Sequence, residues 1–470
     1  MSAHQLSAEN DASVVDAIIV GAGLSGLASA NRLVAAGKSV VVLEARDRVG
    51  GKVYDKTLSG GGVIETGAEF IGPCQDRVRQ IAIELGIKTF KTYASGQNVC
   101  YANGKRNFYD PQTGNHAPLD EAALIQMAST VGSLDTMAQG LDVTAPWKHH
   151  DAAVWDQMTL ASWLDKSIPH PDGRAVMDLT ARSLLSAEPS DVSLLQALTY
   201  IARAGSENTQ GTLQRLISVE GGSQENRFTG GPQRIARGLA DRLGEAVKLN
   251  SPVRTITRVH DVYHVSGETV SVRGRSVVLA LSPPLAGRIT YNPPLPASRD
   301  LLTQKMPMGS LGKVIAIYKT PFWRDEGLSG EAIGLHGVSV QTTFDSSPED
   351  GSHGAILGFL VGNAMRQFDG KTESEIQAAV VEDFVKYFGP KAREVEEWVI
   401  QRWDNEEFSR GGHFAICPPN VLTQYGPAIT EQVGGIFFAG TEAAPYWSGF
   451  MEGAIRAGEI AADKICQQER

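Results

Sequence analysis

The stretch from Asp16 to Arg46, DAIIVGAGLSGLASANRLVAAGKSVVVLEAR, constrains the fold more than any other part of this sequence. A short apolar run at 17–20 ends at the glycine-rich GAGLSG, and apolar residues then recur at helical spacing until Gly37. A second apolar run, SVVVLE, follows the helix. The pattern predicts a strand–helix–strand unit whose parallel strands are covered on both faces, and therefore an α/β fold.

Three glycines in the turn have the spacing of a dinucleotide-binding loop. Gly21 permits the tight turn, Gly23 lets the backbone approach a pyrophosphate, and Gly26 allows close packing of the helix on the strand. The N-terminus of the helix presents free N–H groups and a positive dipole end to phosphates. Glu44, at the end of the second strand, is placed to accept hydrogen bonds from ribose hydroxyls. The unit predicts a dinucleotide site, with NAD and FAD both open.

The residues after the second strand favour FAD. In LEARDRVGGK, the side chains of Arg46, Arg48 and Lys52 supply cations for two phosphates, next to the flexible pair Gly50 and Gly51. Together with the C-terminal run FFAGTEAAPYWSGFMEGAIRAGE, this stretch resembles the flavin-dependent amine oxidases of the monoamine oxidase family.

The resemblance extends over nearly the whole chain, from Asp16 to Ile465. Further blocks that carry it are ETGAEFIGPCQDRVRQIAIELGI, FTGGPQRIARGLADRL with VKLNSPV, YNPPLP, MPMGSLGKVIAIYKTPFW and PPNVLTQYG. It implies an FAD cofactor and a small-molecule amine substrate, with O2 as the electron acceptor.

Chain length supports a two-domain organisation, because 470 residues are too many for one ordinary core. We predict a Rossmann-like FAD-binding domain, discontinuous along the chain, with an inserted α+β substrate-binding domain of mixed sheet and helices. The expected FAD-binding segments are 15–88, 229–296 and 405–470, and the expected substrate-binding segments are 89–228 and 297–404, with a helical part at 119–215. Residues 1–14 are expected to be a disordered N-terminus.

The resemblance also implies cofactor contacts at particular positions. The backbone at 67–70 would lie along the flavin, that of Val253 would meet the adenine, and Trp403 would pack against the isoalloxazine ring. A helix beginning near Gly449 would direct its positive N-terminus at the flavin. The full expected set is Gly21, Gly23, Leu24, Ser25, Gly26, Glu44, Ala45, Arg46, Gly51, Lys52, Gly67, Ala68, Glu69, Phe70, Val253, Trp403, Gly440, Thr441, Glu442, Gly449, Phe450 and Met451.

Three residues are expected to act in catalysis. Lys313, in GSLGK, matches the family's lysine that holds a water against flavin N5. Phe450 and His413 match the two aromatic residues that face each other in front of the flavin, although the family's best-known members carry tyrosine there. The histidine would tune which amines enter and at what pH. Gly412 stands where those members carry a cysteine bonded to the flavin, so FAD binding is expected to be noncovalent.

Four further positions match the substrate cavity and its gate. Leu216, Ile217 and Gln224 would line the cavity, together with His413. Thr342 falls where one family member has a bulky tyrosine, so its small side chain indicates a wider entrance. A longer or bulkier amine is therefore expected as the substrate.

The expected reaction is oxidative deamination of a primary amine to an aldehyde, with release of ammonia and hydrogen peroxide. A polyamine oxidase remains open, but its funnel should carry carboxylates. An L-amino-acid oxidase also remains open, and it needs an arginine clamp, for which Arg215 is the candidate near the gate. From another class, a non-catalytic binding protein like the GDP-dissociation inhibitors would share the fold.

The composition limits the classes of binding partner that can be expected for this chain. The formal net charge of −10 does not favour nucleic acid or an anionic membrane. The four cysteines are widely spaced, which argues against a zinc site or disulfide framework and suits a reducing compartment. We read no signal peptide, no run of roughly 18 apolar residues and no C-terminal membrane anchor, so a soluble cytoplasmic protein is expected. His149 and His150 are interpreted as surface residues, no metal is expected, and a homo-oligomer stays open.

Overall fold

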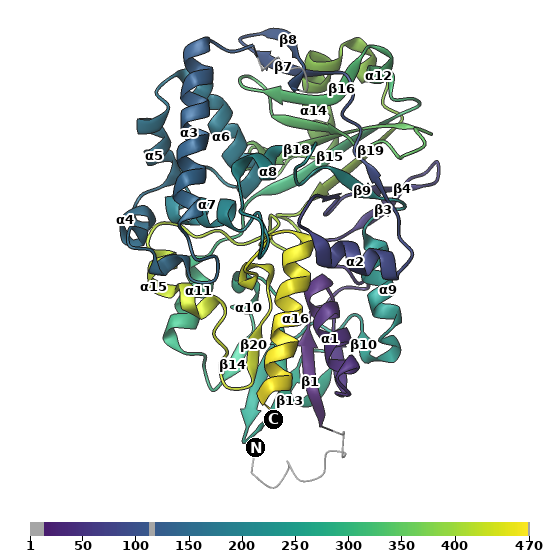
Figure 1. Ribbon diagram of the computed structural model, residues 1–470. Coiled ribbons are helices and arrows are strands. Elements are labelled where there is room, and N and C mark those ends of the chain that lie inside the picture. The colour runs from purple at the N-terminus through teal and green to yellow at the C-terminus, as the bar shows by residue number, and fades with distance from the viewer. Residues whose placement is uncertain (1–13, 112–117, 469–470) are drawn as a thin grey trace.

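The computed structural model describes residues 14–111 and 118–468. The predicted disorder of residues 1–14 therefore lies outside the described residues, except for Val14. Two large sheets dominate the fold, one in the lower half of Figure 1 and one in the upper half.

The lower sheet contains the predicted strand–helix–strand unit. Its central strand β1 runs parallel to β2 on one side and to β13 on the other, and β20 also pairs with β13 in parallel. Strands β12 and β11 continue the sheet in antiparallel pairs. The strands are β10 (Val247–Lys248), β2 (Val40–Leu43), β1 (Val15–Val20), β13 (Ser271–Leu279), β12 (Val262–Ser266), β11 (Thr255–Val259), β14 (Thr290–Asn292) and β20 (Ile436–Phe438).

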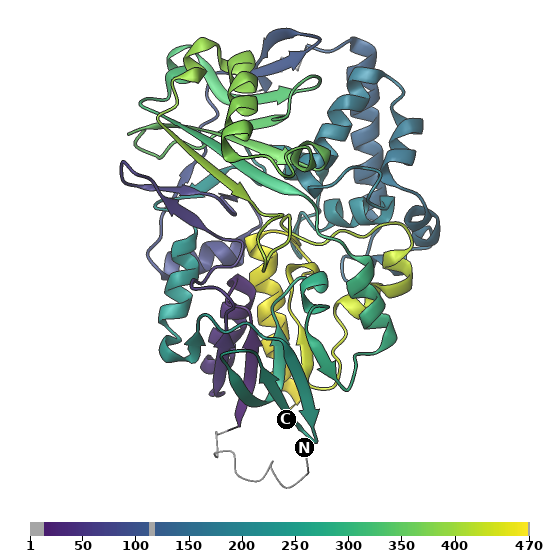
Figure 2. The ribbon, with the colours of Figure 1, turned by 180° about the vertical axis from the view of Figure 1, so that it is seen from behind.

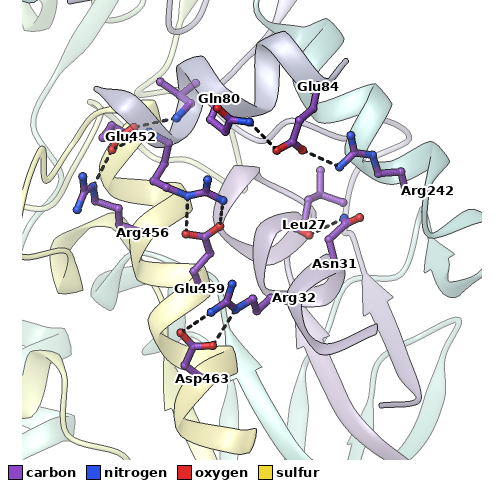
Figure 3. Close-up of polar contacts among 12 residues, drawn as sticks. Leu27, Asn31, Arg32, Gln80, Glu84, Arg242, Glu452, Arg456, Glu459 and Asp463 are labelled. Atoms are coloured by element: carbon purple, nitrogen blue, oxygen red, sulfur yellow. Dashed lines mark hydrogen bonds and ion pairs between the residues drawn. The ribbon is translucent and has the colours of Figure 1, made fainter. Parts of the chain in front are cut away.

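Four helices cover one face of this sheet: α1 (Leu24–Ala35), α2 (Asp76–Glu84), α9 (Gln233–Asp241) and α16 (Met451–Gln468). Their apolar faces share one core with β1, and ion pairs join their exposed sides (Figure 3). Arg32 of α1 pairs with Asp463 of α16 at 2.8 Å, and Glu84 of α2 pairs with Arg242 at 3.5 Å. These helices, from both ends and the middle of the chain, form one layer.

Glycines allow the closest approaches in this layer. A Cβ atom at Gly26 would lie 1.9 Å from the carbonyl oxygen of Gly21, which confirms that this position must be a glycine for the helix to pack on the turn. A Cβ at Gly458 would lie 2.0 Å from the carbonyl oxygen of Ser25, where α16 crosses α1. The two helices are therefore in backbone contact.

The upper sheet is largely antiparallel and is covered by α12 (Phe322–Asp325) and α14 (Glu373–Phe388). Its strands, in order, are β19 (Glu397–Arg402), β15 (Leu311–Tyr318), β18 (Gly354–Val361), β17 (Thr342–Asp345), β16 (Leu328–Gly334), β7 (Gln97–Ala102) and β8 (Lys105–Tyr109). All of them come from the segments expected for the substrate-binding domain, and the strands of the lower sheet all come from the other segments. The boundaries themselves stay a prediction.

The helical character predicted for 119–215 is confirmed, and these helices stand beside the upper sheet in Figures 1 and 2. The helix α7 lies in the middle of this group with every residue buried. The helices are α3 (Glu121–Gln139), α4 (Ala152–Gln157), α5 (Leu160–Ser167), α6 (Pro171–Leu185), α7 (Leu194–Ala202) and α8 (Leu213–Ile217).

Short elements connect the larger parts. Strands β3 (Asp55–Thr57) and β4 (Val63–Glu65) pair with each other, and β9 (Asn226–Phe228) pairs with both β5 (Phe70–Ile71) and β6 (Thr89–Lys91). The remaining helices are α10 (Pro283–Ala286), α11 (Ala297–Lys305), α13 (Asn363–Arg366) and α15 (Val421–Tyr425). Within 14–111 and 118–468, none of the helices is long and apolar enough to cross a membrane.

Candidate active site

A cavity of about 400 Å³ is lined by residues of both sheets. From the lower sheet it receives the loops that follow the carboxyl ends of β1, β2 and β13, where α/β sheets usually bind their ligands. From the upper part it receives Lys313 on β15, Phe359 on β18 and Tyr200 on α7. The N-terminus of α16 closes a further part of the wall.

Most of the residues predicted to bind a cofactor line this one cavity. They are Gly21, Gly23, Leu24, Ser25, Glu44, Ala45, Arg46, Gly51, Lys52, Gly67, Ala68, Glu69, Phe70, Val253, Trp403, Gly440, Thr441, Gly449, Phe450 and Met451. Gly26 lies behind the loop, against Gly21, and Glu442 lies behind Gly440. The structure thus brings together residues that are up to 430 positions apart in the chain.

The glycine-rich loop has the geometry that its sequence predicts. Gly21 has a φ of +102°, and α1 begins at Leu24 directly after Gly23. Glu44 is buried and its carboxylate accepts hydrogen bonds from two backbone N–H groups, those of Ala22 at 2.8 Å and Arg46 at 3.0 Å. These bonds fix Glu44 at the end of β2, and its oxygens keep lone pairs for a ribose.

Two cations lie at the cavity wall. Arg46 donates to the Ser409 hydroxyl at 2.8 Å, and Lys52 Nζ donates to the carbonyl oxygen of His413 at 3.3 Å. Burial lowers the pKa of Lys52 to about 8, and the charge of Arg46 adds to this effect. A diphosphate beside Lys52 would supply the missing countercharge. Arg48 lies outside the cavity lining, where its guanidinium stacks over the ring of Tyr54 at 3.8 Å.

A buried carboxylate oxygen that lacks a hydrogen-bond donor allows a test of whether FAD fits this cavity. Glu442 Oε1 accepts from the backbone N–H of Ala415 at 2.8 Å, but Glu442 Oε2 has no partner although it is buried. It lies so near the cavity wall that a Cβ at Gly440 would come within 2.7 Å of it. An unpaired buried acceptor calls for a donor, and a ribityl chain carries hydroxyl donors. Together with the phosphate loop and the cations, this arrangement fits FAD.

Lys313 is held by protein groups. Its Nζ donates to Glu69 Oε2 at 2.7 Å and to the backbone carbonyl of Glu65 at 3.0 Å. The side chain is buried, and it lines the cavity. Trp403, also at the wall, donates from Nε1 to the carbonyl oxygen of Thr66 at 2.9 Å, so its indole plane is fixed.

His413 lies in the cavity between two hydroxyl groups. Its Nδ1 is 3.3 Å from Ser186 Oγ, and its Nε2 is 3.2 Å from the Tyr200 hydroxyl. Burial, with the charge of Lys52, lowers the pKa of His413 to about 3. The ring is therefore neutral at neutral pH, and this environment does not support the prediction that His413 sets a pH dependence near neutrality.

Tyr200 is a cavity residue that the sequence prediction missed. Its ring stacks on Phe414, with centroids 5.0 Å apart, and lies 6.1 Å from the ring of Phe450. Burial raises the pKa of Tyr200, so its hydroxyl stays protonated. The available signal was the single tyrosine in SLLQALTYIA, a stretch in which apolar residues predominate, because a buried tyrosine hydroxyl needs a partner.

The four residues predicted for the substrate funnel lie in different surroundings. Gln224 lines the cavity, and its Oε1 is a buried acceptor without a partner. Leu216 is buried under it and Ile217 is 41% exposed, while Thr342 Oγ1 lies 3.2 Å from Ser183 Oγ. Leu216, Ile217 and Thr342 are not among the residues that line this cavity, and their substrate role stays a prediction.

Gly412 stands at the position where the family's best-known members carry the flavin-linked cysteine, and Ser186 occupies the space next to it. A Cβ at Gly412 would lie 2.8 Å from the Cβ of Ser186, which ends α6 in a left-handed conformation with φ +54°. None of the four cysteines of the described chain lines the cavity, and Cys417 is fully buried elsewhere. The geometry therefore agrees with noncovalent FAD.

The histidine pair lies apart from this cavity. His149 Nδ1 accepts from the backbone N–H of Asp151 at 3.1 Å, and its ring stacks on Trp155. His150 is 80% exposed and pairs with Asp151 at 3.1 Å. The side chains of 149–151 offer ligand atoms within 4.8 Å of one another.

Comparisons with known proteins agree with this site. Residues 24–466 match the family of flavin-containing amine oxidoreductases. The chain is 35% identical over 453 residues to the probable flavin-containing monoamine oxidase A of Dictyostelium discoideum, covering 96% of this chain and 97% of that protein. It is 35% identical over 457 residues to amine oxidase B of Sus scrofa, covering 96% and 86%.

Solved structures show the same relationship. Wild-type putrescine oxidase bound to putrescine aligns with a TM-score of 0.91 at 32% identity, covering 97% of this chain and 99% of that one. Cyclohexylamine oxidase from Brevibacterium oxydans aligns with a TM-score of 0.91 at 31% identity, covering 97% and 100%. This chain belongs to the flavin-containing amine oxidases and is an FAD-dependent amine oxidase.

Proposed function

We propose that the enzyme deaminates an apolar primary monoamine to an aldehyde, releasing ammonia and hydrogen peroxide, with O2 as the electron acceptor. FAD, when bound, takes up a hydride equivalent from the α-carbon of the amine and passes two electrons to O2. The observation that carries the proposal is the group of His413, Tyr200 and Phe450, which lies in the same cavity as Lys313 and the N-terminus of α16.

The aromatic group would bind the amine in its neutral form. The faces of Tyr200 and Phe450 offer apolar contact, and His413 is uncharged at neutral pH. The hydroxyls of Ser186 and Tyr200 hold the imidazole ring in one orientation. None of these groups is a base strong enough to take a proton from an ammonium ion, so the amine would have to enter deprotonated.

Two features would stabilise negative charge. The N-terminus of α16, at Met451, brings its positive dipole end to the cavity wall, while the backbone N–H of Phe450, just before the helix, donates to the carbonyl oxygen of Trp447 at 3.0 Å. Lys313 adds a cation from the opposite sheet. The helix and the lysine would act together on the negative charge that a bound FAD would take up from the amine.

The walls favour a monoamine over the alternatives. Leu184, Leu311 and Phe359 supply apolar surface, and Glu69, an acid that also lines the cavity, is already paired with Lys313. A polyamine would lack a free carboxylate there. Arg215, the candidate clamp for an amino acid, donates to the carbonyl oxygens of Ala204 and Gln210 and does not line the cavity.

A peroxide-coupled screen tests this proposal. Purified holoenzyme is offered alkyl and arylalkyl primary amines of increasing length, secondary amines, putrescine, spermidine and L-amino acids at fixed pH. The expected result is the highest kcat/KM for apolar primary monoamines. A preference for diamines or for amino acids would contradict it.

We infer the cellular compartment from the free state of the cysteine thiols. All four cysteines are free, and no disulfide joins them in the described chain. We place the enzyme in the cytoplasm, because a reducing compartment keeps such thiols free. Fractionation of the producing cells, with peroxide-forming activity followed in each fraction, tests this; activity confined to a membrane or exported fraction would contradict it.

A further inference from the structure

Four charged side chains are buried together beside the cavity, and two of them, Glu69 and Lys313, line it. The four are Glu65 at the end of β4, Glu69 just before β5, Arg227 on β9 and Lys313 on β15, and each is at most 5% exposed. A charge buried without a partner is strongly destabilising, so each of the four depends on the others. The group contains two cations and two acids, and its formal charges balance.

Glu69 is the centre of this group. Its Oε2 accepts from Lys313 Nζ at 2.7 Å, and its Oε1 lies 3.1 Å from Arg227 Nε. The hydroxyl of Ser346 donates to the same Oε1. Both carboxylate oxygens are therefore engaged, and Glu69 links the cavity wall to the arginine behind it.

Arg227 holds the far side of the group. It donates to Glu65 Oε2 at 2.7 Å and to the carbonyl oxygen of Ser347 at 2.7 Å. Burial alone would raise the pKa of Glu69, but the charges of Lys313 and Arg227 hold it below its ordinary value. Glu69 is thus kept as a carboxylate.

Lys313 lines the cavity while its ammonium group is held by two hydrogen bonds to the protein. An ammonium group has three N–H donors, and protein oxygens of Glu69 and Glu65 take two of them. Both Lys313 and Glu69 line the cavity, and Phe359 lies with its ring centroid 5.6 Å from Nζ. One N–H remains for a group in the cavity, in a direction that Glu69 and the Glu65 carbonyl determine.

We propose that Glu69 is a positioning residue that holds the charged ammonium of Lys313 at the cavity wall, and that reoxidation of the bound FAD by O2 depends on this ion pair. The inference rests on the proposed function, in which FAD would occupy the cavity that Lys313 and Glu69 line. O2 takes two electrons and two protons and leaves as hydrogen peroxide, and a fixed cation stabilises the negative charge that develops on it. The ammonium keeps its own proton throughout.

The first test isolates reoxidation from amine oxidation. The holoenzyme is reduced chemically without amine and mixed with O2, and the return of flavin absorbance is followed in the parent, Glu69→Gln, Lys313→Met, the double variant and Glu69→Asp. Glu331→Gln is the matched control, because Glu331 is another carboxyl of low exposure that accepts an amide hydrogen bond, from Asn98 at 3.2 Å, away from the cavity.

The ion pair predicts a specific pattern of rates. Lys313→Met slows reoxidation by about tenfold or more, Glu69→Gln slows it in the same direction, and the double variant is no slower than Lys313→Met. Glu69→Asp, which keeps the charge, recovers part of the loss, and Glu331→Gln reoxidises at the parent rate. A parent rate in Glu69→Gln, or losses that multiply in the double variant, would overturn the proposal.

Thermal unfolding supplies a second readout that does not use activity. Each single change leaves one buried charge unbalanced, whereas the double variant restores equal numbers of cations and acids. The loss of Tm in the double variant should therefore be smaller than the sum of the two single losses, and additive losses would contradict the coupling. If no amine reduces the parent flavin, the proposed function fails, while both of these readouts still report on Glu69.

Discussion

At the scale of single residues, His413 shows how surroundings decide what a side chain can do. A histidine in a cavity invites the interpretation of a base or a pH sensor. Here burial and the nearby Lys52 cation hold its pKa at about 3, and Ser186 and Tyr200 flank its two ring nitrogens. We therefore expect His413 to act by shape and orientation.

Tyr200→Phe tests that orientation. The change removes the hydroxyl next to His413 Nε2 and keeps the ring that stacks on Phe414. We expect kcat/KM for the best amine to fall about fivefold, which corresponds to about 1 kcal/mol for one hydrogen bond, with the flavin spectrum unchanged. Tyr318→Phe is the control, since the Tyr318 hydroxyl is equally buried and donates to Ala392 far from the cavity. Equal losses in both variants would argue against a role in the site.

At the scale of elements, the crossing of α1 and α16 brings both ends of the chain to the cofactor. The N-termini of both helices line the cavity, and the helices touch where Gly458 lies against the backbone of Ser25. The spacing between the two helices therefore controls the shape of the cavity at both the phosphate loop and Phe450.

Gly458→Ala should push these helices apart. A Cβ there would lie 2.0 Å from the carbonyl oxygen of Ser25, so we expect a stability loss of about 1–3 kcal/mol together with weaker FAD binding. Denaturant unfolding and FAD titration of the apoenzyme measure the two effects. Gly132→Ala is the control, because Gly132 lies inside α3 with no atom within 4 Å of its added Cβ. A neutral result at Gly458 would show that the helices tolerate the displacement.

At the scale of the whole molecule, two buried acids in different parts of the chain share one electrostatic behaviour. Burial raises the pKa of Asp55 to about 7, with the neighbouring Glu65 adding to the effect, and burial raises that of Glu331 to about 7. Unfolded, both would titrate near 4. Their protonated forms favour the folded state, so the contribution is fully present below pH 4 and is lost as pH rises to 7.

The expected result is a free energy of unfolding that falls between pH 4 and pH 7. For one such group the loss is at most about 4 kcal/mol. Asp55→Asn and Glu331→Gln should each flatten the fall, because an amide does not titrate. Urea unfolding of the FAD-loaded enzyme at both pH values measures it. A pH dependence that is the same in the parent and in both variants would contradict the assignment.

Local patterns predicted the parts of the fold that depend on neighbours in sequence. The GAGLSG turn, the two apolar strands beside it and the helical stretch that contains α3 and α7 all follow from spacing. Spacing did not predict the roles of Tyr200 and Ser186 or the Glu69–Lys313 pair. Each of these depends on a contact between segments more than 200 residues apart. Sequence spacing carries no information about such contacts.

Anaerobic mixing of the enzyme with an amine separates reduction of the flavin from its reoxidation. The purified enzyme, with FAD bound, is mixed with an apolar primary amine in the absence of O2, and the flavin absorbance is followed. We expect the amine to bleach the flavin and admitted O2 to restore the colour with one hydrogen peroxide per flavin. The flavin of Lys313→Met should still bleach but should recover its colour slowly. A flavin that chemical reductant bleaches, but that no primary amine does, would contradict the account.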